Sequence, residues 1–171
     1  MAAGRTLVIA ALLVVALLVQ LSVAPVLFPT AVVPDVVLLV VAAVGLRDGA
    51  VAGAWTGFAG GLLIDLAPPS DDLMGQWALA LCVVGLLAGT VDRGSRSTRW
   101  LDLVVSGAAA FVGVSIFALS SIVLGLAGAD LAVASSVVGL AVAYDAVLGL
   151  LVLPLVRAAL DRVEPTPVRG W

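Results

Sequence analysis

Few side chains in this sequence could do chemistry, and those few stand inside or at the ends of apolar runs. They are two amides and three carboxylic acids: Gln20, Gln76, Asp35, Asp65 and Asp145. Such groups can bind a polar ligand, carry a proton or hydrogen-bond a neighbouring backbone, and in an apolar environment each needs a partner. These five residues are therefore the candidates for function.

Asp145 lies deepest, since apolar residues flank it on both sides within a long segment. An unpaired carboxylate at that depth costs about 3 kcal/mol or more. Two interpretations stay open: a structural hydrogen bond that fixes its helix to a neighbour, and a ligand or proton site. The other four candidates stand at helix ends, where they either form a polar cluster or mark the headgroup level.

Several kinds of chemistry are excluded by residue type. The chain has 0 His, which rules out histidine metal sites and catalysis by Ser-His or Cys-His pairs. The single Cys82 cannot form an internal disulfide. No nucleotide-binding loop is present. We expect no catalytic residue, no metal, no cofactor and no nucleic-acid partner.

A row of glycines precedes Asp65 in the sequence. Its members recur every four residues: Gly49, Gly53, Gly57 and Gly61. Each internal glycine costs a helix about 1 kcal/mol in water, whereas in a bilayer small residues let a second helix approach closely. The row predicts either packing within the chain or a groove for a partner's helix. A period of four drifts about 40° per step, so we place the partner contact at Gly57 and Gly61 and internal packing toward Gly49.

The elements that position these residues must be membrane helices. Of the 171 residues 63% are hydrophobic and 11% are charged, and the mean hydropathy is +1.28. A soluble domain is typically about a quarter charged. The composition predicts one all-α integral membrane domain spanning residues 1–171, built as a bundle of six transmembrane helices. The predicted helices cover residues 7–24, 31–46, 49–66, 76–91, 101–126 and 131–156, followed by a cytoplasmic tail at 157–171.

The arginines give this bundle an orientation. With the N-terminus inside, all 8 arginines fall in the head, the turn at 47–48, the loop at 92–100 and the tail. The loops on the other side hold acids and no arginine. Because positive residues favour the cytoplasmic side, we predict a multi-pass protein of the bacterial cytoplasmic membrane with both termini in the cytoplasm.

Several motifs in order resemble one family. They are Gln20-Leu21-Ser22-Val23-Ala24-Pro25, Pro34-Asp35, Gly53-x-x-x-Gly57-Phe58-x-x-Gly61-Leu62-Leu63-x-Asp65, Gly75-Gln76-Trp77-Ala78-Leu79, Tyr144-Asp145 and Leu153-Pro154-Leu155. Together they resemble the rod shape-determining protein MreD family over nearly the whole chain. That family often has Asn at the position of Asp145.

The resemblance implies a non-enzymatic scaffold of the bacterial cell-elongation complex, which binds MreC and helps to regulate peptidoglycan synthesis and cell shape. It implies indirect links to MreB and to RodA with its penicillin-binding partner, and leaves a homodimer open. It also implies a fold like that of the substrate-binding S components of energy-coupling-factor transporters. A vitamin-binding subunit of such a transporter is the alternative function.

The leading hypothesis is that a transmembrane helix of MreC and its adjacent outer segment dock on this chain. The residues predicted to contact this partner are Gly53, Gly57, Phe58, Gly61, Asp65, Asp35, Gln76 and Trp77. Small residues would permit close approach, and the polar helix ends would hydrogen-bond the partner's backbone. Gln20 and Asp145 are structural or ligand candidates, and the loop arginines could contact anionic lipid.

Overall fold

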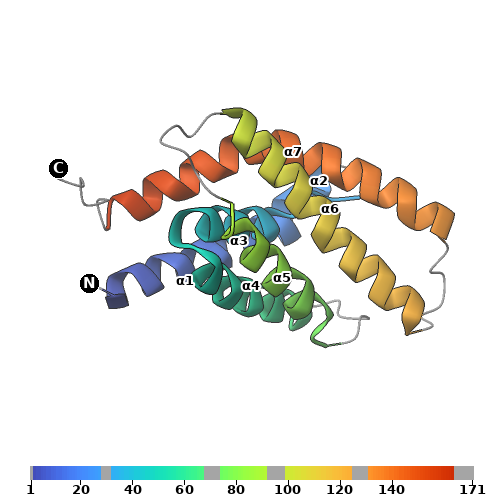
Figure 1. Cartoon of the computed structure of the whole chain (residues 1–171), viewed down its shortest axis with the longest axis horizontal. Helices are drawn as coiled ribbons and strands as arrows, with labels where there is room; N and C mark the ends of the chain where they lie inside the picture. Colours follow the sequence, from blue (N-terminus) through green and yellow to red (C-terminus); the bar gives the residue numbers. More distant parts are fainter. Residues whose placement is uncertain (1, 28–31, 68–73, 92–98, 125–130, 164–171) are drawn as a thin grey trace.

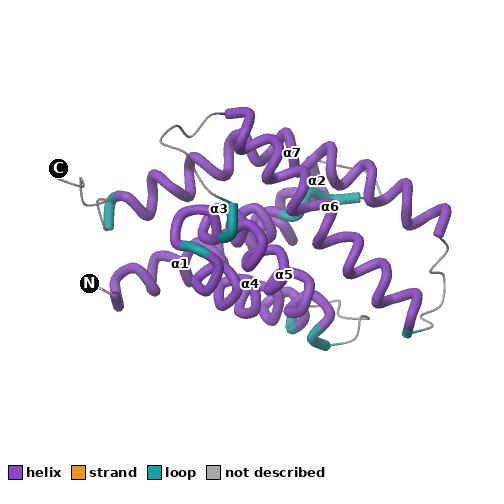
Figure 2. Tube along the Cα trace, viewed as in Figure 1, coloured by secondary structure: helices purple, strands orange, loops and turns teal. Residues whose placement is uncertain are grey.

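The computed structural model describes residues 2–27, 32–67, 74–91, 99–124 and 131–163, and these ranges are mostly helix, joined by short turns and without a strand (Figures 1 and 2). The helices are α1 (Ala2–Leu18), continued by a π-helical turn at Val19–Val23 and by α2 (Ala24–Leu27), then α3 (Val36–Asp48), α4 (Ala50–Asp65), α5 (Gln76–Ala88), α6 (Arg99–Val123) and α7 (Leu131–Asp161). The all-helical prediction is confirmed for these residues, and six helical segments fit a membrane bundle.

Three described stretches are long and apolar enough to cross a membrane: Gly4–Val23, Arg99–Val123 and Ser136–Asp161. The other helices are short. At 13 residues each, α3 and α5 rise about 20 Å, against a hydrocarbon core of about 30 Å. In a bilayer, the ends of such short helices lie where water cannot satisfy their backbone groups, so side chains must do so.

The bundle is organised around α3, which the other helices surround (Figure 1). Every residue from Val37 to Leu46 is buried. A helix that is apolar on all sides belongs in the interior of a protein, and this one has no polar residue between Val36 and Leu46. The sequence therefore explains why the second predicted helix is the core of the molecule.

The first and last helices extend further than predicted. Helical backbone continues past Pro25, which we expected to end the first helix, to Leu27. The π-helical turn immediately before Pro25 changes the hydrogen-bonding register there, and such turns relieve a proline inside a helix. At the other terminus α7 continues to Asp161, through the first five residues of the predicted tail.

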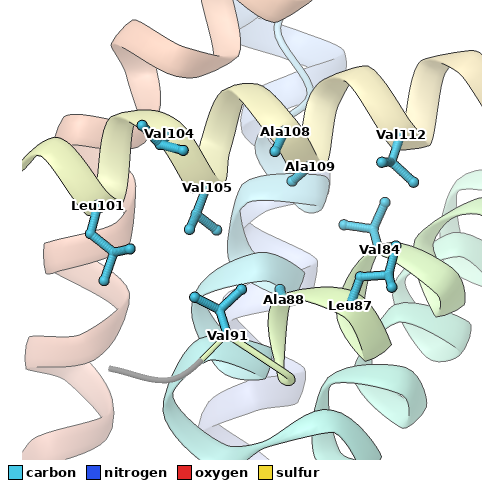
Figure 3. Close-up of a pocket in the computed structure, with 10 residues that line it drawn as sticks. All are labelled: Val84, Leu87, Ala88, Val91, Leu101, Val104, Val105, Ala108, Ala109 and Val112. Atoms are coloured by element: carbon cyan, nitrogen blue, oxygen red, sulfur yellow. The ribbon is translucent and has the colours of Figure 1, made fainter. Parts of the chain in front are cut away.

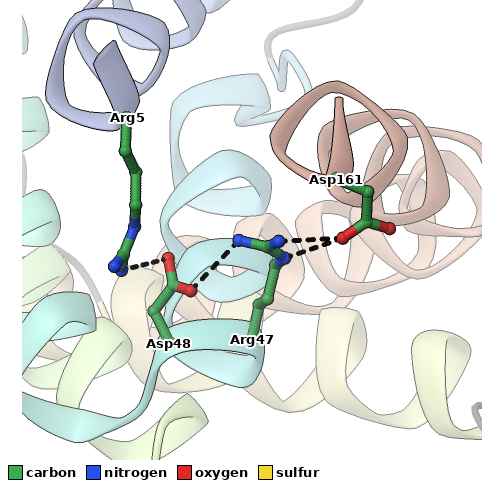
Figure 4. Close-up of polar contacts among 4 residues, drawn as sticks. All are labelled: Arg5, Arg47, Asp48 and Asp161. Atoms are coloured by element: carbon green, nitrogen blue, oxygen red, sulfur yellow. Dashed lines mark hydrogen bonds and ion pairs between the residues drawn. The ribbon is translucent and has the colours of Figure 1, made fainter. Parts of the chain in front are cut away.

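Ion pairs hold that last part of α7. Arg157 pairs with the buried Asp102 of α6, and Asp161 accepts hydrogen bonds from Arg47 at 2.8 and 3.1 Å. Arg47 also contacts Asp48, which pairs with Arg5 of α1 at 2.8 Å (Figure 4). These contacts join the beginnings of α1 and α6 to the ends of α3 and α7, and we call this the charged end of the molecule.

Candidate functional site

The predicted polar residues gather at the opposite end, which we call the capped end because two buried helix N-termini lie there. The structure does not bring all five together. It places Gln20, Asp35 and Asp145 around the start of α3, and it places Asp65 and Gln76 around the start of α5. These groups form two separate clusters.

Side chains from three parts of the chain satisfy the first backbone N–H groups of α3. The N–H of Asp35 donates to Oδ1 of Asp145 at 2.8 Å, and that of Val37 donates to Oε1 of Gln20 at 3.1 Å. The N–H of Leu38 donates to Oδ1 of Asp35 at 2.9 Å. Each acceptor replaces water at a helix terminus where none is available. This favours the structural interpretation of Asp145, whose side chain is 0% exposed.

One carboxylate caps α5. Asp65, the last residue of α4, accepts N–H groups from Gly75 at 2.9 Å, Trp77 at 3.1 Å and Ala78 at 3.1 Å. Gly75 has φ of +96°, a conformation that side chains rarely adopt, and it turns the chain so that these N–H groups converge. A negative charge at this terminus also interacts favourably with the helix dipole.

Gln76 and Trp77 contact α6 rather than an open surface. The amide nitrogen of Gln76 lies 2.6 Å from Oγ of Ser120 and 2.8 Å from Oγ of Ser121. The Trp77 ring stacks on Phe117, with centroids 4.6 Å apart. These predicted partner residues therefore join two helices of the same chain.

The glycine row is occupied by α5. A Cβ placed on Gly53, Gly57 or Gly61 would overlap backbone atoms of the facing helix, at Gly85, Leu81 and Ala78 respectively. These contacts support internal packing, the other interpretation of the row, and a partner contact at these glycines stays a prediction. Sequence alone could not decide, because a small-residue row does not say whose helix approaches it.

The opposite face of α4 is open. Trp55 is 70% exposed and Phe58 is 46% exposed, and their rings meet edge to face with centroids 6.5 Å apart. Of the predicted partner residues, Phe58 is the one that lies on a free face of α4. Exposed apolar side chains alone indicate no more than contact with lipid.

Beside this face, a groove of about 360 Å³ runs between α1 and α4. We call it the α1–α4 groove, and it is lined by Arg5, Thr6, Ile9, Ala10, Leu13, Ala52, Trp55, Thr56 and Ala59. Alanine and threonine make up five of these nine residues, which suits the close approach of another membrane helix. We did not predict this groove. The signal was present as small residues four apart, at Thr6 and Ala10 and at Ala52 and Thr56.

The contacts that the two capping clusters make are with backbone of the same chain. In the described part of the chain, no group of three or more His, Cys, Asp and Glu residues could hold a metal ion. Buried oxygens without a hydrogen-bond partner among the described residues remain on Asp35, Asp145 and Gln76. The engaged oxygens accept backbone N–H groups, so the clusters fix the starts of α3 and α5.

Comparison with known proteins gives one match. The family model described as rod shape-determining protein MreD matches residues 2–163. No curated protein and no solved structure matches the chain significantly. The expected likeness to energy-coupling-factor S components therefore stays a prediction.

Proposed function

The chain belongs to the rod shape-determining protein MreD family, and we propose that it acts in the rod complex as a non-enzymatic scaffold that binds MreC. The family determines rod shape as part of a membrane complex, and the long apolar helices make this chain a membrane protein. Through MreC the scaffold would connect indirectly with MreB and with the RodA pair, and so regulate peptidoglycan synthesis.

The α1–α4 groove carries this proposal. Helices associate in lipid through small residues and occasional polar contacts, and the groove offers Ala10, Ala52 and Ala59 together with Thr6 and Thr56. The transmembrane helix of MreC would lie in it, parallel to α4. The exposed rings of Trp55 and Phe58 would then border the contact.

The remaining predicted partner residues take a different role in this proposal. Asp35, Asp65 and Gln76 engage their own chain at the capped end, so they support the helices that build the groove. The glycines at 53, 57 and 61 do the same by bringing α5 against α4. This leaves Phe58 as a direct contact, and a homodimer within the complex stays a prediction.

We place the charged end in the cytoplasm, with six membrane crossings. Arg5, Arg47 and Arg157 lie at that end, in accord with the preference of arginine for the cytoplasmic side. A cysteine introduced at Ser97, in the arginine-rich loop, should resist a membrane-impermeant thiol reagent in intact cells. Labelling from outside would mean that the orientation is the reverse of the one proposed.

Nothing in the described part of the chain favours the alternative function, a vitamin-binding subunit of a transporter, and this alternative is set aside.

Binding of MreC through the α1–α4 groove is tested by filling the groove. Ala59 is exposed and lines it. The Ala59→Trp protein should lower co-purification of MreC about tenfold, since overpacking an interface costs about 1–3 kcal/mol. Ala143→Trp, at an exposed position of α7, is the matched control and should leave the yield of MreC unchanged. Full retention of MreC by a folded Ala59→Trp protein would remove the groove from the contact.

A further inference from the structure

A second groove opens between α5 and α6, and its walls are entirely apolar (Figure 3). We call it the α5–α6 groove. It has a volume of about 260 Å³ and is lined by Val84, Leu87, Ala88, Val91, Leu101, Val104, Val105, Ala108, Ala109 and Val112. Figure 3 shows these side chains pointing into the space between the two helices.

The side chains that line the α5–α6 groove indicate whether a helix or a hydrocarbon chain fits it better. It contains no side chain that can donate or accept a hydrogen bond, and valine and leucine supply most of it. The α1–α4 groove, by contrast, has two threonines and an arginine. Because membrane helices pair through small and polar residues, the α5–α6 groove suits a hydrocarbon chain better than a helix. Its volume also lies below the range of about 300–1,000 Å³ that whole ligands occupy.

Its length matches one leaflet of a bilayer. Along α6 the lining extends from Leu101 to Val112, which corresponds to about 17 Å of helix. Half of a hydrocarbon core is about 15 Å. Trp100, next to Leu101 at the start of α6, is 75% exposed, as is typical of a tryptophan at the membrane surface. The groove therefore begins at the interface and ends near the middle of the membrane.

A positive charge lies at the same end of α6, on the side of the helix that faces α7. Arg99 is the first residue of α6, is exposed, and forms no ion pair with the residues that the structure describes. It also lines a shallow hollow of about 150 Å³ with Trp100, Leu103 and Leu150. The nearby acid Asp102 is buried and paired with Arg157, so it does not cancel the charge of Arg99.

We propose that the α5–α6 groove binds one acyl chain of an anionic phospholipid, from the leaflet in which α6 begins, and that Arg99 attracts its phosphate. The helix N-terminus adds to this attraction, because its dipole favours an anion. The site is independent of the MreC contact, which lies between α1 and α4. Lipid bound here would cover the face that α5 and α6 leave open between them.

The test uses the full chain, purified in mild detergent and mixed with equal amounts of phosphatidylglycerol and phosphatidylcholine that carry the same acyl chains. Native mass spectrometry then counts the lipids retained. We expect preferential retention of phosphatidylglycerol. Arg99→Gln should reduce that preference about fivefold, the contribution of one basic side chain near an anionic surface. Ala108→Phe should abolish retention by filling the groove.

Ala143→Phe, at an exposed position on α7, is the matched control and should retain lipid like the unchanged chain. Val104 is exposed and also lines the groove. If Ala108→Phe does not fold, lipid retention is measured on Val104→Trp instead. Equal retention by the groove variants and the control would overturn the proposal. Equal retention of both lipids, unaffected by Arg99→Gln, would contradict its anionic part. If Ala108→Phe lowered co-purification of MreC from membranes and left lipid retention unchanged, the groove would instead hold a helix.

Discussion

Asp145 is buried within α7, yet its contact lies at the start of another helix 110 residues earlier in the chain. Its Oδ1 accepts the N–H of Asp35, and Oδ1 of Asp35 in turn accepts the N–H of Leu38. An amide oxygen could accept the first of these bonds equally well. The contact therefore requires an acceptor oxygen at this position, which an amide can supply.

The prediction at this position compares an amide with an apolar side chain. Asp145→Asn should keep the acceptor and change the free energy of unfolding by less than about 1 kcal/mol. Asp145→Leu should lose about 1–3 kcal/mol, because it leaves the N–H of Asp35 buried without a partner. Thermal unfolding of both purified proteins in detergent provides the measurement. Equal losses in the two variants would mean that the carboxylate itself is required.

Sequence predicted these residues better than it predicted their partners. Asp35, Asp65 and Asp145 stand out because charged side chains are rare beside apolar runs, and the cost of burying them implies a bond. The hydrogen-bond partner of each acid could not be predicted, because donor and acceptor lie far apart in the chain. The ion pairs of Arg157 and Asp161 were not predicted for the same reason, since the charged residues after the last apolar run were assigned to a cytoplasmic tail.

Among the helices, α4 and α5 show how the glycine row works. Backbone meets backbone along the row: the Cβ of an added alanine at Gly53 would overlap the Gly85 carbonyl, and one at Gly85 would overlap the Gly53 carbonyl. Backbone cannot rotate away as a side chain can, so each glycine is required by the closeness of the two helices. This packing fixes α5 against α4, which forms one wall of the α1–α4 groove.

Paired alanine substitutions test this packing. Gly57→Ala should lower the free energy of unfolding by about 1–3 kcal/mol through overpacking against Leu81. Gly139→Ala is the control on α7, where an added Cβ meets nothing within 4 Å. It should be neutral or stabilising, because alanine is the better helix former. A Gly57→Ala protein as stable as the Gly139→Ala protein would show that the two helices are not in contact at this point.

The sequence predicted an all-helical chain whose six helices fit a membrane bundle, because membrane helices have a strong compositional signal. It did not predict that the short α3 is central. Nor did it predict the continuation of helix through Pro25, where the π-helical turn before the proline supplies an alternative bonding pattern. Neighbour relations between helices depend on packing that composition does not record.

At the scale of the whole molecule, the two ends have different chemistry. At the charged end, ion pairs join α1, α3 and α7 (Figure 4), and Arg157 of α7 pairs with Asp102 of α6. At the other end, buried side chains cap α3 and α5. Between them, two grooves of different character face outward. The lining of one includes three alanines, two threonines and an arginine, and the other is lined by valine, leucine and alanine alone. We propose a protein partner for the first and a lipid for the second.

The central claim is that MreC lies in the α1–α4 groove, and site-specific photocrosslinking in cells tests it most directly. A benzophenone amino acid would replace Ala59 in the groove, Ala108 in the α5–α6 groove, or the exposed Ala143 of α7. We predict a crosslink to MreC from position 59 and none from positions 108 and 143. A crosslink to MreC from position 108, with none from position 59, would contradict the account.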